Sequence, residues 1–305
     1  MPPLLVIGGA TATGKTGLAI EVAERLIATG RPAEIVSADS RQVYRGLDIG
    51  TAKVGEADRA RVPHHGLDLV EPDVPFTVVD FTTHALTALA EIGRKGGVAI
   101  LAGGTGLYLR AVGRGLDTTA LPSDPVVRAR LEAEYATDGL AATAARLTRM
   151  APLLAATIDL RNPRRVVRAL EIAELRGDGP LPEPLGYPGP VAWIGLTLEP
   201  EEHRRRIDHR ARAQFDAGLI AEAAGLRERF DPALPAFSAI GYSEAWAVLD
   251  GHLTLDAAIE VDIGRNVAFA KRQRTWFRAE PDMSWYDTTA EPPIEAILAT
   301  ALRLG

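Results

Sequence analysis

The sequence predicts an α/β fold, a parallel sheet of the phosphate-loop (P-loop) type that is flanked by helices and carries a helical insertion domain. Short apolar runs at 4–7, 34–37, 98–101 and 191–198 alternate with helical patterns, which is typical of a parallel sheet with helices on its faces. The first run leads into a glycine-rich turn and then a helical pattern that ends near Thr29. The stretch 117–176 is rich in Ala, Leu and Arg and shows no convincing strand.

The turn after the first predicted strand reads Gly9, Ala10, Thr11, Ala12, Thr13, Gly14, Lys15 and Thr16. A glycine-rich turn between a strand and a helix predicts a phosphate-binding loop. Its backbone N–H groups and the helix N-terminus would surround an anion, Lys15 would reach the outer phosphate, and the Thr16 hydroxyl would ligate Mg²⁺. The loop predicts binding of a diphosphate or polyphosphate, but neither its identity nor the reaction.

The next two predicted strands end in residues that could carry chemistry. Asp39 follows the second strand, and the turn 103–108, which contains Thr105, follows the third. The carboxyl ends of parallel strands share one edge of a sheet, so both residues should lie near the phosphate loop. Asp39 could ligate Mg²⁺, accept a proton from a nucleophile, or cap the next helix. Taken alone, the turn around Thr105 is better explained as a simple strand-to-helix connection.

The predicted helical insertion covers 117–190, and the core would comprise 1–116 and 191–305. Turn and cap residues at 122–125 open it, and it closes at 177–190, where nine of fourteen residues are Gly or Pro. Residues 160–170 include four arginines and no acid. Glu171 and Glu174 are expected on the exposed face of a helix. Beyond the fourth strand the chain looks mostly helical.

One helical segment mixes cations with aromatic rings: Lys271, Arg272, Gln273, Arg274, Thr275, Trp276, Phe277 and Arg278. RNA-binding surfaces use this mixture, with cations on phosphates and rings on bases. A solvated helix that buries its aromatic rings is an equally good interpretation. Arg206 and Arg210 lie one helical turn apart and could clamp a phosphate, although ion pairing explains some of the arginines around them.

Composition excludes several classes of protein. The 305 residues contain no cysteine, which excludes disulfides and thiolate metal sites. No window approaches the apolar length of a membrane span, and no signal peptide fits the start, so we expect a cytoplasmic enzyme. The net charge of −6 argues mildly against a nucleic-acid partner, but residues 263–279 hold five basic residues and no acid. Adjacent histidines point apart, so we expect a structural role for His64 and His65.

Together these motifs closely resemble the tRNA dimethylallyltransferase family, also called tRNA isopentenyltransferases, in its bacterial form. The resemblance covers nearly the whole chain, at 9–16, 39–53, 62–65, 103–108, 162–165, 241–242 and 271–278. The phosphate loop is common to many families, whereas the run 39–53 and the Lys-Arg-Gln-x-Thr-Trp-x-Arg pattern are specific. The chain departs from the family pattern at Ala10, where bacterial members often carry Pro, and at Ser243, which replaces a frequent Arg.

The resemblance implies transfer of a dimethylallyl group from dimethylallyl diphosphate to the exocyclic amine of the adenosine 3′ to the anticodon in tRNA. Asp39 would be the general base, Thr105 would hold the reacting centre, and the loop 9–16, Mg²⁺ and Arg210 would hold the diphosphate. The tRNA anticodon stem-loop would contact both catalytic residues and the segment 271–278. It would also contact Ser40, Arg41, Gln42, Gly241 and Tyr242, and the insertion residues Arg128, Arg164, Arg165 and Arg168. We expect a monomer without membrane contact.

Two other function classes explain part of the sequence. A P-loop kinase that uses ATP and a small hydroxylic acceptor accounts for the loop and Asp39, but leaves the basic segments without a purpose. A nucleotide-gated RNA-binding protein without catalysis accounts for the basic segments, but gives Asp39 and Thr105 no chemical task.

Overall fold

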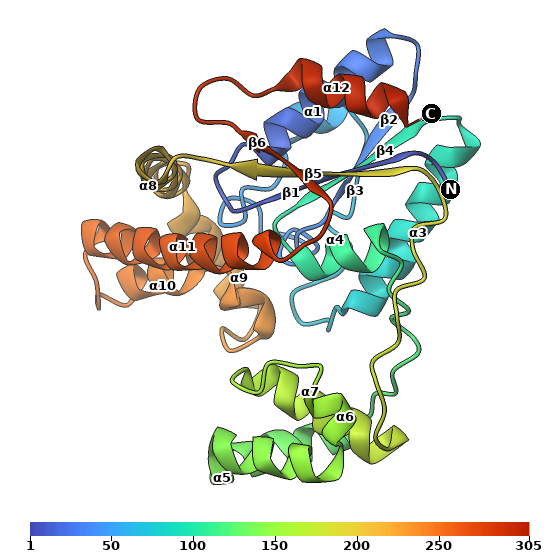
Figure 1. Ribbon diagram of the computed structural model, residues 1–305. Coiled ribbons are helices and arrows are strands. Elements are labelled where there is room, and N and C mark those ends of the chain that lie inside the picture. Colours follow the sequence, from blue (N-terminus) through green and yellow to red (C-terminus); the bar gives the residue numbers. More distant parts are fainter. Residues whose placement is uncertain (305) are drawn as a thin grey trace. The chain divides into compact units, whose positions relative to one another are not determined.

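The computed structural model describes residues 1–304 (Figure 1). The chain forms two compact units, one of Met1–Gly115 with Gly186–Gly305 and one of Leu116–Leu185. The second unit is the segment predicted as an insertion, with boundaries at 116 and 185 where the sequence suggested 117 and 190.

The larger unit is built on one six-stranded sheet with the strand order β3-β2-β4-β1-β5-β6, and every pair of neighbours is parallel. The strands are β1 Leu4–Gly9, β2 Ala33–Ser37, β3 His64–His65, β4 Val98–Gly103, β5 Val191–Thr197 and β6 Met283–Asp287. The predicted fold class and its four strands are confirmed as β1, β2, β4 and β5. The two edge strands, β3 and β6, were not predicted. The chain after β5 is mostly helical, as expected, with β6 as the one strand among residues 198–304.

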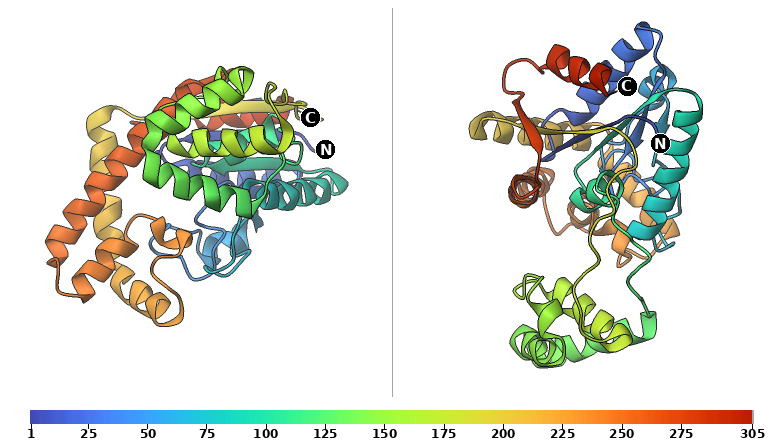
Figure 2. Two further views of the ribbon diagram at one scale, coloured as in Figure 1. Left: turned by 90° about the horizontal axis from the view of Figure 1, so that it is seen from below. Right: turned by 45° about the vertical axis from the view of Figure 1, so that its right-hand side comes forward.

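The helices of this unit connect the strands and cover the sheet. They are α1 Lys15–Ala28, α2 Glu56–Arg61, α3 Val78–Arg94, α4 Gly106–Gly113, α8 Pro200–Asp216, α9 Leu219–Arg229, the 3₁₀ turn η1 Pro235–Ser238, α10 Tyr242–Leu249, α11 Leu255–Arg278 and α12 Ile294–Arg303. Figure 2 shows α1 and α12 on one side of the sheet and α3 and α4 on the other.

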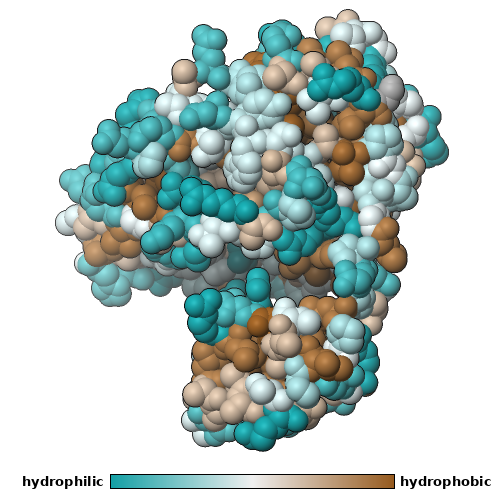
Figure 3. All heavy atoms as spheres, in the orientation of Figure 1, coloured by the Kyte–Doolittle hydropathy of each residue, from teal (hydrophilic) through white to brown (hydrophobic). Residues whose placement is uncertain are grey.

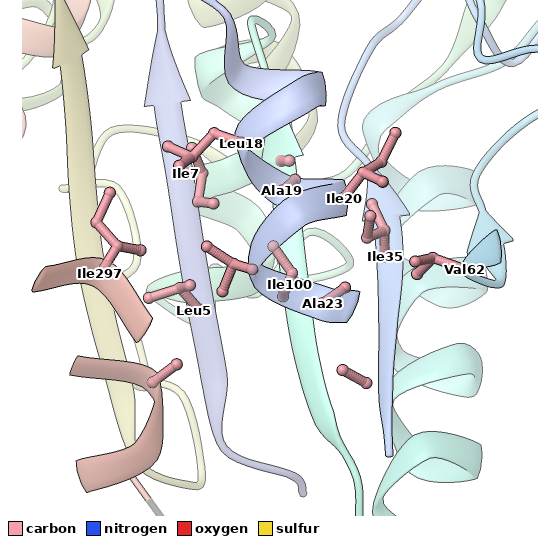
Figure 4. Close-up of a cluster of buried hydrophobic side chains, with 14 of the residues drawn as sticks. Leu5, Ile7, Leu18, Ala19, Ile20, Ala23, Ile35, Val62, Ile100 and Ile297 are labelled. Atoms are coloured by element: carbon pink, nitrogen blue, oxygen red, sulfur yellow. The ribbon is translucent and has the colours of Figure 1, made fainter. Parts of the chain in front are cut away.

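Alternation along the strands sends side chains to these two layers. Leu5 and Ile7 pack toward α1 and α12, whereas Leu4 and Val6 pack toward α3 and α4. Apolar residues of α1 recur every three or four positions, which gives that helix one continuous buried face. Figure 4 labels part of the first layer: Leu5, Ile7, Leu18, Ala19, Ile20, Ala23, Ile35, Val62, Ile100 and Ile297.

A second core forms where α8, α9, α10 and α11 enclose the segment that follows β2. Tyr44, Phe237 and Trp246 are buried in it, and Phe237 meets the Trp246 ring edge-on at 5.2 Å between centroids. This core fixes α8 and α11 against the carboxyl edge of the sheet, and both helices supply side chains to the site described below.

The smaller unit contains α5 Pro125–Met150, α6 Pro152–Ala155 and α7 Pro163–Arg176. Asp124 caps α5, as its place in the turn predicted, and α5 is kinked at Gly139, which has a φ of 77°. Leu131, Leu147 and Leu170 lie in its small apolar core. This unit therefore has a hydrophobic core of its own.

Within residues 1–304, no helix is long and apolar enough to cross a membrane. Figure 3 shows hydrophilic and apolar side chains interspersed on the face in view.

Candidate active site

The phosphate loop connects β1 to α1 at the carboxyl edge of the sheet. Ala12 and Gly14 adopt left-handed backbone conformations, with φ of 60° and 86°. At Gly9, a Cβ atom would lie 2.9 Å from the Leu196 carbonyl oxygen, so the close approach of the loop to β5 requires glycine. Ala10 is buried in the α8–α11 core. The strand, loop and helix have the arrangement that the motif predicts.

Side chains from three distant segments hold this loop. All three polar groups of Thr11 are bonded: its N–H donates to Gln273 Oε1 at 2.8 Å, its carbonyl lies 2.8 Å from His203 Nε2, and its Oγ1 accepts from Arg210 at 2.7 Å. Thr288 donates to the Thr13 carbonyl at 3.1 Å. Sequence reasoning missed His203 and Thr288, because neither belongs to a motif and each acts on backbone far along the chain.

The two predicted diphosphate-binding cations converge on the loop. Lys15 Nζ donates to the Ala10 carbonyl at 2.6 Å. Burial, and then the neighbouring Arg210 guanidinium, lower the pKa of Lys15 to about 7, while Asp39 acts in the opposite direction. Burial also lowers the pKa of Arg210, against the attraction of Asp39 and Asp262. Lys15, Arg210 and Asp39 therefore share one electrostatic environment.

Asp39 and Thr105 lie on loops that are bonded to one another. Thr105 donates its N–H to the Ala38 carbonyl at 3.1 Å, and its Oγ1 accepts from the Ser40 N–H at 3.0 Å. At Gly103, a Cβ would lie 2.1 Å from the Ala38 carbonyl oxygen, so only glycine permits this approach. The structure thus brings together two residues that the sequence separates widely.

The Asp39 carboxylate is oriented by its own turn. Oδ1 accepts from the N–H groups of Arg41 at 2.8 Å and Gln42 at 3.4 Å. The second oxygen, Oδ2, accepts no hydrogen bond from any of residues 1–304. The capping interpretation is therefore correct for one oxygen, although it caps a turn and not a helix, and the other oxygen remains open to a ligand.

The sequence of 271–278, at the end of α11, allowed either an RNA-binding surface or a solvated helix that buries its aromatic rings. The structure has features of both. Gln273, Trp276 and Phe277 face inward, where Cβ atoms added at Gly104, Gly106 and Gly8 would lie 2.4, 2.3 and 2.6 Å from them. Arg274 and Trp276 are half-buried, and the exposed residues of this segment are Lys271, Arg272, Thr275 and Arg278. The helix therefore has one face fitted to glycine-rich loops and one face with free cations.

Four residues predicted to contact RNA are buried within the larger unit instead. Gln42 and Gln273 are 8% and 6% exposed, Phe277 1%, and Tyr242 0%. The Tyr242 hydroxyl donates to Glu222 Oε1 at 2.7 Å, and Glu222 also accepts from the N–H groups of residues 48–50. We revise the prediction for these four side chains: they support the site from inside. Gly241, also buried, has a φ of 109° and begins the turn into α10.

A pocket of about 230 Å³ lies beside the phosphate loop. Its lining is Gly9, Ala10, Thr13, Leu196, Thr197, Leu198, His203, Arg274, Phe277, Arg278 and Trp285. Apolar side chains and cations thus border the same space, which suits a ligand with a charged head and an apolar tail.

The insertion unit pairs some of its predicted RNA contacts internally. Arg128 and Arg168 both donate to Glu171 Oε2, at 2.5 and 2.7 Å. Burial raises the pKa of Glu171, but hydrogen bonds from the two arginines outweigh it and hold the pKa below its ordinary value. The prediction of an exposed Glu171 is wrong, because its side chain is fully buried. Arg164 and Arg165 are exposed at the start of α7.

His64 and His65 form the short strand β3. His65 Nε2 lies 2.6 Å from Glu34, and His64 Nδ1 lies 2.7 Å from the Val62 carbonyl. No group of three His, Cys, Asp or Glu side chains in residues 1–304 could hold a metal. The contacts of both histidines agree with a structural role.

The fold and the loop define a phosphate-loop protein of the α/β class. The family model described as IPP transferase matches residues 42–280. The chain is 38% identical to the tRNA dimethylallyltransferase of Bordetella avium, over 99% of this chain and 98% of that protein. For the protein of the same name from Anaeromyxobacter sp. strain K, identity is 45% over 92% of each chain. The chain therefore belongs to the IPP transferase family.

Solved structures agree with this assignment. The tRNA isopentenylpyrophosphate transferase of Bacillus halodurans superposes with a TM-score of 0.71 at 37% identity, covering 99% of this chain and 95% of that one. A eukaryotic dimethylallyltransferase, whose structure was determined as it acts on tRNA, superposes with a TM-score of 0.77 at 25% identity. The match covers 95% of this chain and 74% of that one. The comparisons do not support the kinase alternative.

Proposed function

We propose that this protein transfers a dimethylallyl group from dimethylallyl diphosphate to the exocyclic amine of the adenosine 3′ to the anticodon in tRNA. The observation that carries the proposal is the junction of two loops in a chain of this family. At the first loop, Lys15 and the side chain of Arg210, which comes from α8, lie around a phosphate-binding turn. The second loop bears Asp39, whose Oδ2 accepts no hydrogen bond from residues 1–304.

The phosphate loop would hold the leaving group. Lys15, Arg210 and the N–H groups of the loop stabilise the charge that develops on diphosphate as its bond to the first carbon of the allyl group breaks. The neighbouring pocket has apolar walls from Leu196, Leu198 and Phe277, which suit the hydrocarbon tail. The donor would thus be held at both ends before attack.

Asp39 and Thr105 would serve the acceptor. The amine nitrogen forms the new bond to carbon and passes a proton to the free oxygen of Asp39, which is the role of a general base. Thr105 Oγ1 already accepts from Ser40, so its own O–H proton is free to donate to the nucleobase. To reach Asp39 and Thr105, the adenosine has to leave its stack.

We expect Mg²⁺ to bind beside the phosphate loop. Since residues 1–304 offer no cluster of metal-ligating side chains, the ion would bind the exposed Thr16 hydroxyl, diphosphate oxygens and water, which is how Mg²⁺ commonly binds phosphates. When bound, it would neutralise charge on the diphosphate.

The exposed cations of α11 and α7 would contact tRNA phosphates. Lys271 and Arg272 are exposed on α11, and Arg164 and Arg165 on α7. Arg278 is exposed as well and also lines the pocket. We propose that the protein acts as a monomer. A tRNA substrate implies action in the cytoplasm.

A transfer assay tests the function. Purified protein with Mg²⁺ should move label from dimethylallyl diphosphate to tRNA whose anticodon-adjacent adenosine is unmodified. A tRNA with guanosine at that position should accept none. Absence of transfer, together with ATP turnover on a small acceptor, would contradict the proposal.

A further inference from the structure

A buried glutamine connects the two loops of the proposed site. Gln273 Oε1 accepts from the Thr11 N–H at 2.8 Å, and its Nε2 donates to the Gly104 carbonyl at 2.9 Å. Thr11 belongs to the phosphate loop, and Gly104 immediately precedes Thr105. The partners fix the amide orientation, because an N–H requires an acceptor and a carbonyl requires a donor. One side chain therefore spans from the donor loop to the acceptor loop.

The span is closely fitted at both ends. A Cβ at residue 104 would lie 2.4 Å from Gln273 Nε2, so any other residue there would displace the amide. At the other end, His203 and Arg210 hold the remaining polar groups of Thr11. Gln273 is only 6% exposed. Loss of its amide would therefore leave the Thr11 N–H and the Gly104 carbonyl without a hydrogen-bond partner and largely shielded from water.

We propose that Gln273 is a positioning residue that sets the distance between the donor's diphosphate and the acceptor amine. This inference rests on the proposed function. Attack requires the amine nitrogen and the allyl carbon about 3–3.5 Å apart, and a 1 Å misplacement can cost about 100-fold in rate. Gln273 acts through the backbone of both loops, so its removal lowers the rate of the chemical step while each substrate still binds.

The test replaces the amide while keeping the size of the side chain. Gln273→Met preserves length and volume but makes neither hydrogen bond, and Gln273→Asn keeps the amide but reaches only one loop. We expect single-turnover transfer at saturating substrates to fall about 100-fold in Gln273→Met and also to fall in Gln273→Asn. Dissociation constants for inorganic diphosphate and for tRNA should change less than about threefold.

Gln214→Met is the matched control. Gln214 lies on α8 and donates to the carbonyls of Ile49 and Gly50 at 2.5 and 2.9 Å, so the same substitution removes two hydrogen bonds to backbone that belongs neither to the phosphate loop 9–16 nor to the turn 103–108. This variant should keep the transfer rate. A second check combines Gly104→Ala with Gln273→Met. The double variant should be scarcely slower than either single variant, because both substitutions break the same contact between Gln273 and Gly104.

Three results would overturn the inference: a wild-type rate in either Gln273 variant, a loss explained by weaker diphosphate binding, or an equal loss in Gln214→Met. If Gln273→Met melts before the assay temperature, Gln273→Asn decides the question. Failure of the wild-type protein to transfer any dimethylallyl group is a separate outcome, since it contradicts the proposed function itself.

Discussion

The phosphate loop of the larger unit and the Glu171 cluster of the insertion unit are held together by different kinds of contact. Around the phosphate loop, Gln273 and His203 bond to backbone atoms, and glycines allow the approach. In the insertion unit, arginines are held by carboxylates, as when Arg128 and Arg168 bind Glu171. Hydrogen bonds from side chains to the backbone depend on the length and shape of the side chain, whereas ion pairs depend on its charge. Changes of side-chain shape should therefore act most on catalysis, and changes of charge most on the insertion unit and its RNA contacts.

The largest effect should come from Asp39. Asp39→Asn keeps an oxygen that can accept from the Arg41 N–H, so the turn should persist, but the base is lost. Single-turnover transfer should fall about 10²–10⁴-fold, the range for loss of a general base. The tRNA dissociation constant should stay within about threefold. Substantial remaining transfer would show that Asp39 is not the base.

The ion pairs of the insertion unit are tested at Glu171. Glu171→Ala leaves two partly exposed arginines and the Asp124 N–H without their shared carboxylate, and loss of such hydrogen bonds costs about 1–3 kcal/mol. Hydrogen exchange of residues 116–185 should rise accordingly, while exchange in β1 and β4 stays unchanged. Glu183→Ala, at an exposed position, should shift stability by less than about 0.5 kcal/mol. If Glu171→Ala and Glu183→Ala changed the stability of the insertion unit equally, the ion pairs of Glu171 would not be what stabilises that unit.

Lys15 tests whether the phosphate loop also contains a charge-sensitive group. With a pKa of about 7, Lys15 is charged below that pH and increasingly neutral above it. Diphosphate favours the charged form, so binding above pH 7 requires proton uptake, and affinity should fall by up to about tenfold per pH unit. Lys15→Arg stays charged, so its profile reports the titration of diphosphate alone. Parallel profiles of the two proteins would contradict the lowered pKa.

The smallest effect should come from single RNA-facing cations. Lys271→Ala should weaken tRNA binding a few-fold and reduce the slope of log K against log salt by about 0.7–0.9, as for one phosphate contact. Arg128→Ala should reduce the slope less, because Glu171 already neutralises part of its charge. Filter binding over a salt series measures both slopes. An unchanged slope in Lys271→Ala would exclude a phosphate contact there.

The sequence predicted the parts of the fold that local patterns encode. The buried strands β1, β2, β4 and β5 are continuous apolar runs, and the loop after β1 has a specific spacing of glycines. β3 has only two residues, and β6 is an edge strand in which Trp285 is 42% exposed, so neither has such a run. Pairing with the neighbouring strand, which local sequence does not show, defines both.

The sequence predicted which residues form the candidate site better than it predicted the direction in which their side chains point. The position of Asp39 and Thr105 at strand ends was enough to predict their convergence. The inward direction of Gln273 and Tyr242 depends on glycines far along the chain, at 104 and 50, which give them space. Glu171 looked like a surface residue because its partner Arg128 lies on another helix.

The fit of α11 against glycines has an evolutionary consequence. Trp276 occupies the space that a side chain at residue 106 would need, and Phe277 does the same at residue 8. A larger residue at either glycine is tolerable only if the facing aromatic ring shrinks at the same time. Across relatives, each glycine and the ring that faces it should therefore covary, although about 170 or more residues separate the members of each pair.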